Sequence, residues 1–122
     1  MILCDTNIII EIFKGNTKTI SDIKKIGTDN ICISSITAME LLYGALNKRE
    51  LNSIKKNINK LQIIHVNNDI SKISLTLIES YSKSHNLQIP DAIIAATALY
   101  ENISLLTYNV KDFKFIEKIT LY

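Results

Sequence analysis

The sequence predicts an α/β fold in three layers, with helices on both faces of a short, mostly parallel sheet of four to five strands. Two observations predict it. Apolar runs too short to form the core of a helix alternate with segments of helical periodicity along the 122 residues. Parallel strands also need crossover connections, which the helical segments supply. Because the chain has neither an internal repeat nor a Gly/Ser-rich linker, residues 1–122 are expected to form a single domain.

The first half of the chain predicts two strands and four helices. The apolar run at 2–4 predicts a strand, and a helix over 8–13 follows it with Asp5 or Thr6 as its cap. A helix over 19–26 ends at Gly27, and residues 31–33 predict the second strand. Ser34 or Ser35 then caps a helix from 36 to about 46, and another helix spans 50–61. The apolar side of the helix at 36–46 is expected to consist of Met39, Leu42, Tyr43 and Leu46.

The second half continues the alternation with a third strand over 63–66. Asp69 begins a long helix whose apolar positions recur at helical spacing, namely Ile70, Ile73, Leu77 and Tyr81. Pro90 opens a helix that runs to about Glu101, since proline is tolerated in the first turn. A fourth strand at 104–107, a short helix at 110–116 and an edge strand at 119–121 complete the predicted order.

The composition excludes several classes of protein. With 47% hydrophobic residues the chain is not intrinsically disordered. It has no apolar stretch near the roughly 20 residues of a membrane span and no basic region typical of a secretion signal, so we expect a cytoplasmic protein without membrane contact. The net charge of +2 permits nucleic-acid contact without indicating it. Cys4 and Cys32 are expected to be buried thiols, and neither His65 nor His85 has a neighbour at metal-ligand spacing.

Acidic side chains gather where the predicted fold places its functional edge. In open α/β sheets, this edge lies beyond the carboxyl ends of the strands. Asp5 follows the first strand, Asn109 and Asp112 follow the fourth, and Asp91 opens the helix that leads into the fourth. Singly, Asp5 could serve only as a helix cap, Asp91 only as a first-turn acid and Asp112 only as a solvated one. All of them at one end of the sheet favour a functional site.

Glu40 is a further candidate, one turn into the helix after the second strand. Its sequence neighbours Met39 and Leu41 are apolar, and a buried acid is costly unless it is paired or binds a metal. Converging carboxylates without His or Cys are suited to a hard cation such as Mg²⁺ or Mn²⁺. Such ions polarise phosphoryl oxygens and help to deprotonate water, which predicts phosphodiester hydrolysis. Periodicity alone does not separate this chemistry from that of other Mg²⁺-dependent phosphoryl enzymes.

Four segments together resemble the PIN-domain ribonucleases, and most closely the VapC-type toxins of prokaryotic toxin–antitoxin pairs. They occur in the family's order and span nearly the entire chain. The segments are Ile2-Leu3-Cys4-Asp5-Thr6-Asn7, the run from Ser34 to Gly44 with Glu40 inside it, Pro90-Asp91-Ala92 with the helix that follows, and Leu105-Leu106-Thr107-Tyr108-Asn109-Val110-Lys111-Asp112-Phe113.

The resemblance implies roles for individual residues. Asp5 and Asp91 would hold Mg²⁺ or Mn²⁺ directly, and Glu40 would bind a second ion or orient the attacking water. Three polar residues would support the site through hydrogen bonds: Thr6, Asn7 and Thr107. The fourth position departs from many relatives, because it carries Asn109 with Asp112 three residues later. An amide can ligate a metal but cannot act as a base, so this fourth role stays open between the two residues.

The resemblance also implies a substrate and partners. The substrate would be RNA in a single-stranded region or loop of tRNA or rRNA, and the partners would be a second copy of the chain and a small antitoxin whose C-terminal tail reaches the acidic site. Lysines must flank such a site, and three spaced as on one helical face are candidates for RNA contact: Lys111, Lys114 and Lys118. A second basic stretch contains Lys48, Arg49, Lys55, Lys56 and Lys60, although an ordinary solvated face is the default interpretation of both groups.

Other functions compete with this interpretation. A non-catalytic PIN-like module that binds RNA or a protein is the main alternative, favoured by Asn109 and opposed by the three acids. A phosphoacceptor receiver domain would need paired acids after the first strand and an acceptor directly after the third, whereas Asp5 is single and Asp69 begins a helix. A dinucleotide-binding enzyme would need a GxGxxG turn, and the glycines are too scattered for one, at Gly15, Gly27 and Gly44.

Overall fold

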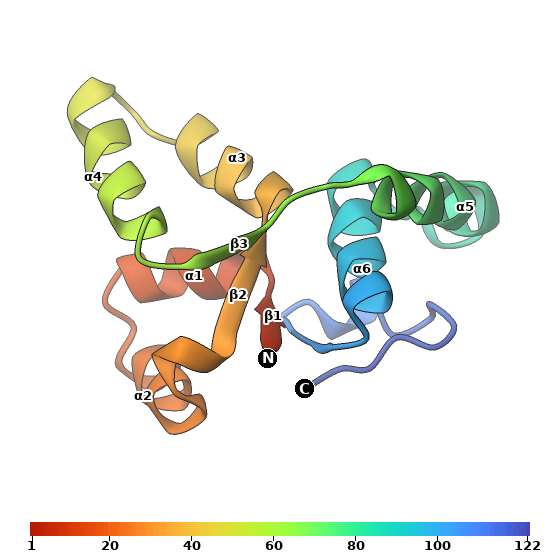
Figure 1. Ribbon diagram of the computed structural model, residues 1–122, viewed down its shortest axis with the longest axis horizontal. Coiled ribbons are helices and arrows are strands. Elements are labelled where there is room, and N and C mark those ends of the chain that lie inside the picture. Colours follow the sequence, from red (N-terminus) through yellow and green to blue (C-terminus); the bar gives the residue numbers. More distant parts are fainter.

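A parallel sheet of four strands lies at the centre of the computed structural model, which describes all 122 residues (Figure 1). The strands are β1 (Ile2–Cys4), β2 (Ile31–Ser34), β3 (Gln62–Ile64) and β4 (Ser104–Leu106), in the spatial order β3-β2-β1-β4. All three strand pairs are parallel, and Leu3 of β1 lies opposite Cys32 on one side and Leu105 on the other. The predicted parallel sheet is therefore confirmed.

Helices cover both faces of this sheet (Figure 1). One side carries α1 (Thr6–Phe13), α2 (Thr17–Ile26), α3 (Ser35–Tyr43) and α4 (Lys48–Ile58), and the other carries α5 (Asn68–His85) and α6 (Ile89–Glu101). Two 3₁₀ turns complete the fold, η1 (Thr28–Asn30) and η2 (Val110–Asp112). None of the helices combines the length and apolarity that crossing a bilayer requires.

The core is split into two apolar clusters because successive side chains of each strand point to opposite faces of the sheet. Leu3 packs with α5, α6 and the C-terminal segment, whereas its neighbour Cys4 packs on the side of α1 to α4. Cys32 and Ile33 of β2 divide in the same way. Both cysteines are buried free thiols, as expected. Because helices cover both faces, the side chains on each side of a strand must be apolar, which explains the continuous apolar runs and confirms the three layers.

The caps of two helices place polar side chains at the carboxyl edge of the sheet. Asp5 caps α1, where its Oδ1 accepts a hydrogen bond of 2.8 Å from the backbone N–H of Thr6. Ser34 caps α3 in the same way through the N–H of Ile36, at 3.3 Å. Because each strand passes directly into its helix, the residues at these junctions are fixed by both elements.

The C-terminal segment differs from its prediction. The helix expected over 110–116 is only the 3₁₀ turn at 110–112, followed by further tight turns that insert Phe113 and Ile116 into the core. The edge strand expected at 119–121 is reduced to a single parallel bridge between Leu105 and Leu121. The chain must also return to β4, where Leu121 bridges Leu105, so tertiary packing overrides the local periodicity.

The apolar side expected for α3 is also wrong. The helix ends at Tyr43, and the buried face is formed by Thr37, Ala38 and Leu41. Tyr43 is 93% exposed and Leu46, beyond the helix, is 86% exposed. Met39 is exposed as well and Leu42 only half-buried. Small residues face the sheet because α3 packs closely against it, and the large apolar side chains are left outside.

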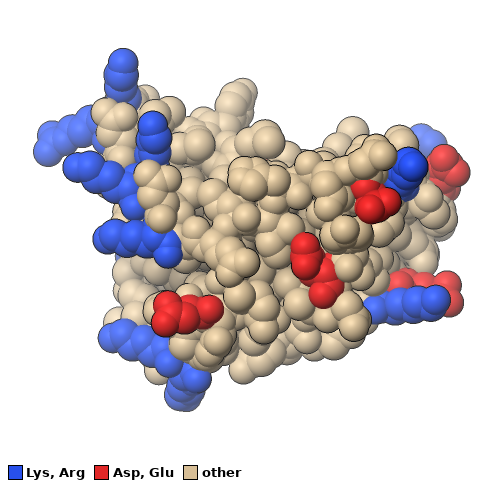
Figure 2. Space-filling model, in the orientation of Figure 1, with Lys and Arg blue, Asp and Glu red and all other residues tan.

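Charged side chains are unevenly distributed over the surface. Figure 2 shows Lys and Arg gathered over the side of the molecule that carries α4 and α2, while acidic side chains lie mainly toward the middle and the opposite side of this view. Only one ion pair is formed, between Lys18 and Asp22 within α2 at 3.2 Å. Basic side chains thus predominate on the side of α4 and α2, whereas the opposite side carries both signs.

Candidate active site

The predicted site residues come together at the carboxyl ends of β1 and β4. These strands are neighbours in the sheet although they lie at opposite ends of the chain, so the connections leaving this point run to different sides. Such a topological switch point is the usual position of a ligand site in open α/β sheets. Asp5 follows β1, Thr107 follows β4, and Asp91 lies in the first turn of α6.

Asp5 is the most firmly held residue of the site. Its side chain is buried, with only 4% of the residue exposed. In addition to the cap bond of Oδ1, its Oδ2 accepts a hydrogen bond of 2.7 Å from Oγ1 of Thr107. That same hydroxyl oxygen accepts a bond of 2.9 Å from the backbone N–H of Asn109. The hydroxyl of Thr107 therefore links the carboxylate after β1 to the loop after β4, as the supporting role predicted for Thr107 requires.

Glu40 reaches the site from α3 but is not buried, so the argument from the cost of burial is wrong for this residue. Its Oε1 accepts a hydrogen bond of 2.8 Å from Oγ1 of Thr6, which also lies 3.0 Å from Oγ1 of Thr37. The two buried threonines thus join α1 to α3 beneath the exposed carboxylate. Thr37 was missed from sequence; its spacing three residues before Glu40, one helical turn, was the available signal.

The acids also interact electrostatically. Burial raises the pKa of Asp91 to about 6, and the negative charges of Asp5, Asp112 and Glu40 contribute to the increase. Burial likewise raises the pKa of Asp5, against the lowering effect of its hydrogen bonds to Thr107 and Thr6, and Asp112 adds to the increase. Four carboxylates therefore share one region. Asp112 contributes to the increase at both Asp5 and Asp91, which indicates a negative charge near these two groups.

The oxygen atoms of the site are suitable ligands for a hard divalent cation, but the acidic side chains lie far apart. All the converging ligands are oxygens, and no His or Cys takes part. No group of three acidic, His or Cys side chains is close enough together to enclose a metal ion as it stands. A cation at this point would offset the repulsion among the acids, which adds to the effect of burial on the pKa of Asp91. The electrostatics therefore fit such an ion even though the ligands are not drawn tightly together.

The other predicted residues lie less centrally. Asn7 is exposed and Asn109 half-buried, and the bond that anchors Asn109 is made by its backbone N–H. The three lysines after β4 are exposed, but they do not share a helical face, because the segment is not a helix; they are Lys111, Lys114 and Lys118. Lys118 adopts a left-handed backbone conformation with φ of 68°. The spacing argument for these three lysines is therefore wrong.

A further contact fixes the loop after β4. The hydroxyl of Tyr108 lies 2.5 Å from Oγ1 of Thr19 on α2, and Thr19 is only 1% exposed. Since Tyr108 stands between Thr107 and Asn109, this bond anchors the loop that contacts Asp5. Neither residue was predicted from sequence, because no local pattern links positions 89 residues apart.

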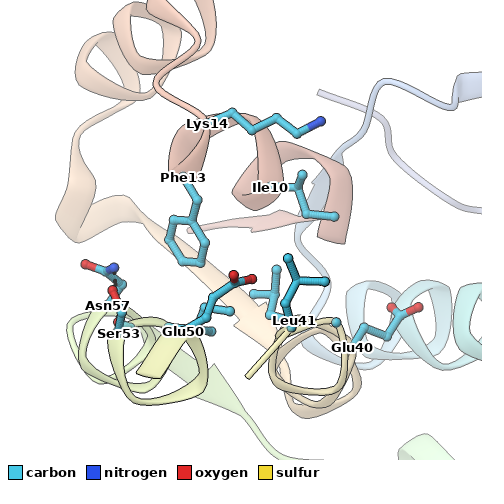
Figure 3. A pocket seen from close by; sticks show the side chains of 11 residues that line it. Ile10, Phe13, Lys14, Glu40, Leu41, Glu50, Ser53 and Asn57 are labelled. Carbon is cyan, nitrogen blue, oxygen red and sulfur yellow. Dashed lines mark hydrogen bonds between the residues drawn. The ribbon is translucent and has the colours of Figure 1, made fainter. Parts of the chain in front are cut away.

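Beside the site, α1, α3 and α4 enclose a groove of about 590 Å³ (Figure 3). Ile10, Phe13 and Leu41 give it an apolar lining. Lys14 of α1 stands on one side, and Glu50 of α4 on the other. Glu40 belongs to the same lining, so one end of the groove reaches one acid of the predicted site.

Comparison with known proteins gives matches over almost the whole chain. The sequence profile described as "PIN domain" matches residues 2–118. A protein of Salmonella typhimurium named tRNA(fMet)-specific endonuclease VapC is 27% identical, over 98% of this chain and 94% of its own length.

Solved structures with the same fold come from toxin–antitoxin systems. A toxin–antitoxin complex from Klebsiella pneumoniae contains a chain with a TM-score of 0.82 and 32% identity, covering 98% of this chain and 96% of that one. VapBC2 of Rickettsia felis, solved with a DNA fragment from its promoter, gives a TM-score of 0.83 and 30% identity, covering 100% and 98%. These matches confirm the resemblance seen in the sequence motifs.

Proposed function

The chain belongs to the PIN domain family, and from this premise we propose that it is a metal-dependent endoribonuclease, the toxin of a toxin–antitoxin pair acting in the cytoplasm. The observation that carries the proposal is the placement of Asp5 and Asp91 at the carboxyl edge of the sheet, with Glu40 beside them. The negative charges of Asp5, Asp112 and Glu40 add to the effect of burial on the pKa of Asp91. Similarity to a VapC endonuclease and to toxin–antitoxin complexes supports it.

We assign a role to each acid from its position and its burial. Asp5 and Asp91 would hold a Mg²⁺ or Mn²⁺ ion, since both are partly withdrawn from water and face the same region. The bound cation would polarise a phosphoryl oxygen and lower the pKa of water. Glu40 is exposed on the groove, where its carboxylate can orient an attacking water or contact a second ion. Asp112 adds negative charge that favours cation binding. The backbone N–H of Asn109 donates a hydrogen bond to Thr107 and so holds the loop after β4 in place.

RNA in a loop or single-stranded region of tRNA or rRNA is the proposed substrate. The site is open and carries no deep pocket for a base, so recognition would rest on the shape of the RNA around the cut. The related Salmonella protein is named for its action on one tRNA. Phosphate would be repelled by the carboxylates alone, which makes both the divalent ion and flanking lysines necessary.

An antitoxin segment is proposed as the occupant of the groove between α1, α3 and α4. Its apolar lining would take apolar side chains of the segment, and its connection to Glu40 would bring the end of the segment to the acids. A cationic side chain there would pair with the carboxylates in place of the metal. Exposed Leu46 extends the apolar surface beside the groove.

A homodimer is proposed through the surface of α5 and α6. Leu75 and Ile89 are large apolar side chains with exposures of 63% and 67%, and they line a shallow hollow together with Val66, Ile78 and Ile93. Contiguous exposed apolar surface of this kind is typical of protein contacts. A second copy related by twofold symmetry would cover the same residues on both chains.

Substitution of the acids tests the enzymatic proposal. We expect Asp5→Asn and Asp91→Asn each to lower the rate of RNA cleavage in Mg²⁺ or Mn²⁺ by about 100-fold or more, because an amide is a poor replacement for a charged metal ligand. The control is Asp69→Asn, which changes an exposed acid in the first turn of α5 in the same way and should leave the rate unchanged.

Sequencing of the ends of cellular RNA after brief expression identifies the substrate. New ends confined to loops of tRNA or rRNA, and lost in Asp91→Asn, are expected. Wild-type protein that binds RNA but produces no cleavage with either ion would contradict the proposal and favour a non-catalytic binding module.

A further inference from the structure

The outward side of α4 concentrates positive charge. All five basic residues of the segment 48–60 are exposed, and they are Lys48, Arg49, Lys55, Lys56 and Lys60. Lys48 and Lys55 are two helical turns apart, as are Arg49 and Lys56, so each pair lies in line along the helix. Figure 2 shows basic side chains gathered at the position of α4. We refer to the four of them that lie on the helix as the basic face of α4, namely Lys48, Arg49, Lys55 and Lys56; Lys60 follows the end of the helix.

The opposite side of the helix has a different character. Ile58 is buried in the core, and Ile54 and Asn57 line the groove that leads to Glu40. Packing therefore depends on one side of α4, and the basic side chains on the other side are exposed. Folding does not explain why that side should be so strongly basic.

The basic face lacks acidic partners. Glu50 is the only acid between residues 48 and 60, so five positive charges and one negative charge give this segment a net charge of +4. The whole chain carries +2, which leaves −2 for the remainder. The single ion pair of the protein, Lys18 with Asp22, lies on α2. An ordinary solvated helix face mixes charges of both signs, whereas this one keeps like charges together, which is unfavourable unless a polyanion binds them.

Helix α4 lies next to the helix that carries Glu40, and its basic face is turned away from the groove between them. Helices α3 and α4 pack together, and both contribute to the groove that contains Glu40. A nucleic acid at the carboxylates meets repulsion there and needs compensating cations along the strand that leaves the site. No other group of five unpaired basic residues lies within so short a segment of the chain.

We propose that the basic face of α4 binds the phosphate backbone of single-stranded RNA that extends beyond the cleaved bond. This inference rests on the proposed function and adds to it a surface for the substrate away from the acids. Lysine side chains read charge rather than sequence, so the contact would strengthen binding to any RNA long enough to reach from the acids to α4. Few aromatic residues accompany the lysines, so base stacking contributes little.

Binding in the absence of divalent ions tests the surface separately from catalysis. The probe is a fluorescein-labelled oligouridylate of 20 nucleotides, measured by fluorescence anisotropy in EDTA over a series of NaCl concentrations. We expect Lys55→Gln/Lys56→Gln to reduce the slope of log affinity against log salt by about 1.4, since each lost phosphate contact accounts for roughly 0.7 with single strands. If the two proteins bind equally well at 1 M salt, the smaller slope corresponds to about tenfold weaker binding of the variant at 0.15 M.

Two matched variants serve as controls. Lys72→Gln/Lys83→Gln removes two exposed lysines from α5 on the other side of the sheet and should bind as the wild type does. Lys55→Arg/Lys56→Arg keeps the charge and should also retain the affinity. Circular dichroism and thermal unfolding establish that each variant is folded.

Several outcomes would overturn the inference. The first is equal affinity and equal salt dependence of the α4 and α5 variants, and the second is a wild-type protein that does not bind the oligonucleotide. A loss confined to a 20-base-pair DNA duplex would assign the basic face to DNA instead. Because none of these measurements involves cleavage, an inactive wild-type protein would contradict the proposed function and leave the result on α4 unaffected.

Discussion

The pKa of the Asp91 carboxyl group reflects its environment in the fold. Its pKa is raised to about 6 by burial and by the neighbouring charges, chiefly that of Asp5. An acid with a raised pKa holds its proton more tightly in the folded chain than in the unfolded one. Its contribution to stability is therefore present at low pH and is lost as the pH rises from about 4, the unfolded value, to about 6. Above pH 6 the folded protein carries the full unfavourable charge.

Replacement of this group should stabilise the protein at neutral pH. Without divalent ions at pH 7.5, we expect Asp91→Asn to increase the free energy of unfolding by about 1 kcal/mol, a value reduced for solvent screening and for the lost interaction with the helix dipole. At pH 4 the two proteins should be equally stable. Urea unfolding at both values measures the difference.

A matched variant distinguishes the relief of repulsion at Asp91 from the general effect of replacing an acid in the first turn of a helix. Asp69→Asn changes an exposed first-turn acid of α5 and should lower the stability slightly at pH 7.5, which is the opposite sign. A gain for Asp91→Asn that did not depend on pH would show that repulsion among the acids is not its cause.

Among the elements, those with strong periodicity or clear caps could be predicted and those governed by distant contacts could not. Ser34 as the cap of α3 and Pro90 in the first turn of α6 mark helix starts, and the structure has both. The segment after Val110 has helical spacing, but the burial of Phe113 breaks it into turns. The local sequence pattern thus predicts a helix that packs on one face of the sheet. It does not predict a segment that must also return to pair with a strand.

The site follows the same division. Asp5, Asp91 and Asp112 could be placed at one edge of the sheet from strand order alone, and their electrostatic coupling agrees with that placement. Glu40 was predicted for a wrong reason, since its neighbours in sequence are apolar but its side chain points outward from α3. Which face of a short helix is buried depends on packing distance, and the sequence of α3 does not reveal it.

The link between α2 and the loop after β4 gives a prediction at the scale of elements. Tyr108→Phe removes the bond to Thr19 and leaves a buried hydroxyl on α2 without its partner across the loop. We expect the free energy of unfolding to fall by about 1–2 kcal/mol. The control is Tyr100→Phe, which changes a partly exposed tyrosine at the end of α6 and should have little effect. Equal stability of the two variants in urea unfolding would show that the Tyr108 bond does not hold the loop.

On the scale of the whole molecule, the two apolar surfaces have separate expected roles. The surface on α5 and α6 is proposed for a second copy, and the groove on α1, α3 and α4 for an antitoxin segment. They lie on opposite sides of the sheet, so one chain could use both at once (Figure 1). Binding of the antitoxin would then not require the dimer to separate.

Charge substitutions on each surface distinguish these roles. Leu75→Glu places a carboxylate at the centre of the proposed dimer contact, where burial without a partner is strongly unfavourable, so we expect a dimer of the wild type to become a monomer in light scattering after size-exclusion chromatography. Leu46→Glu makes the same change at a more exposed apolar residue that lines the groove and should leave the dimer intact. The reverse result, a monomer for Leu46→Glu and a dimer for Leu75→Glu, would move the contact between copies to the α3–α4 side, and the groove could not then receive an antitoxin segment without competition from the second chain.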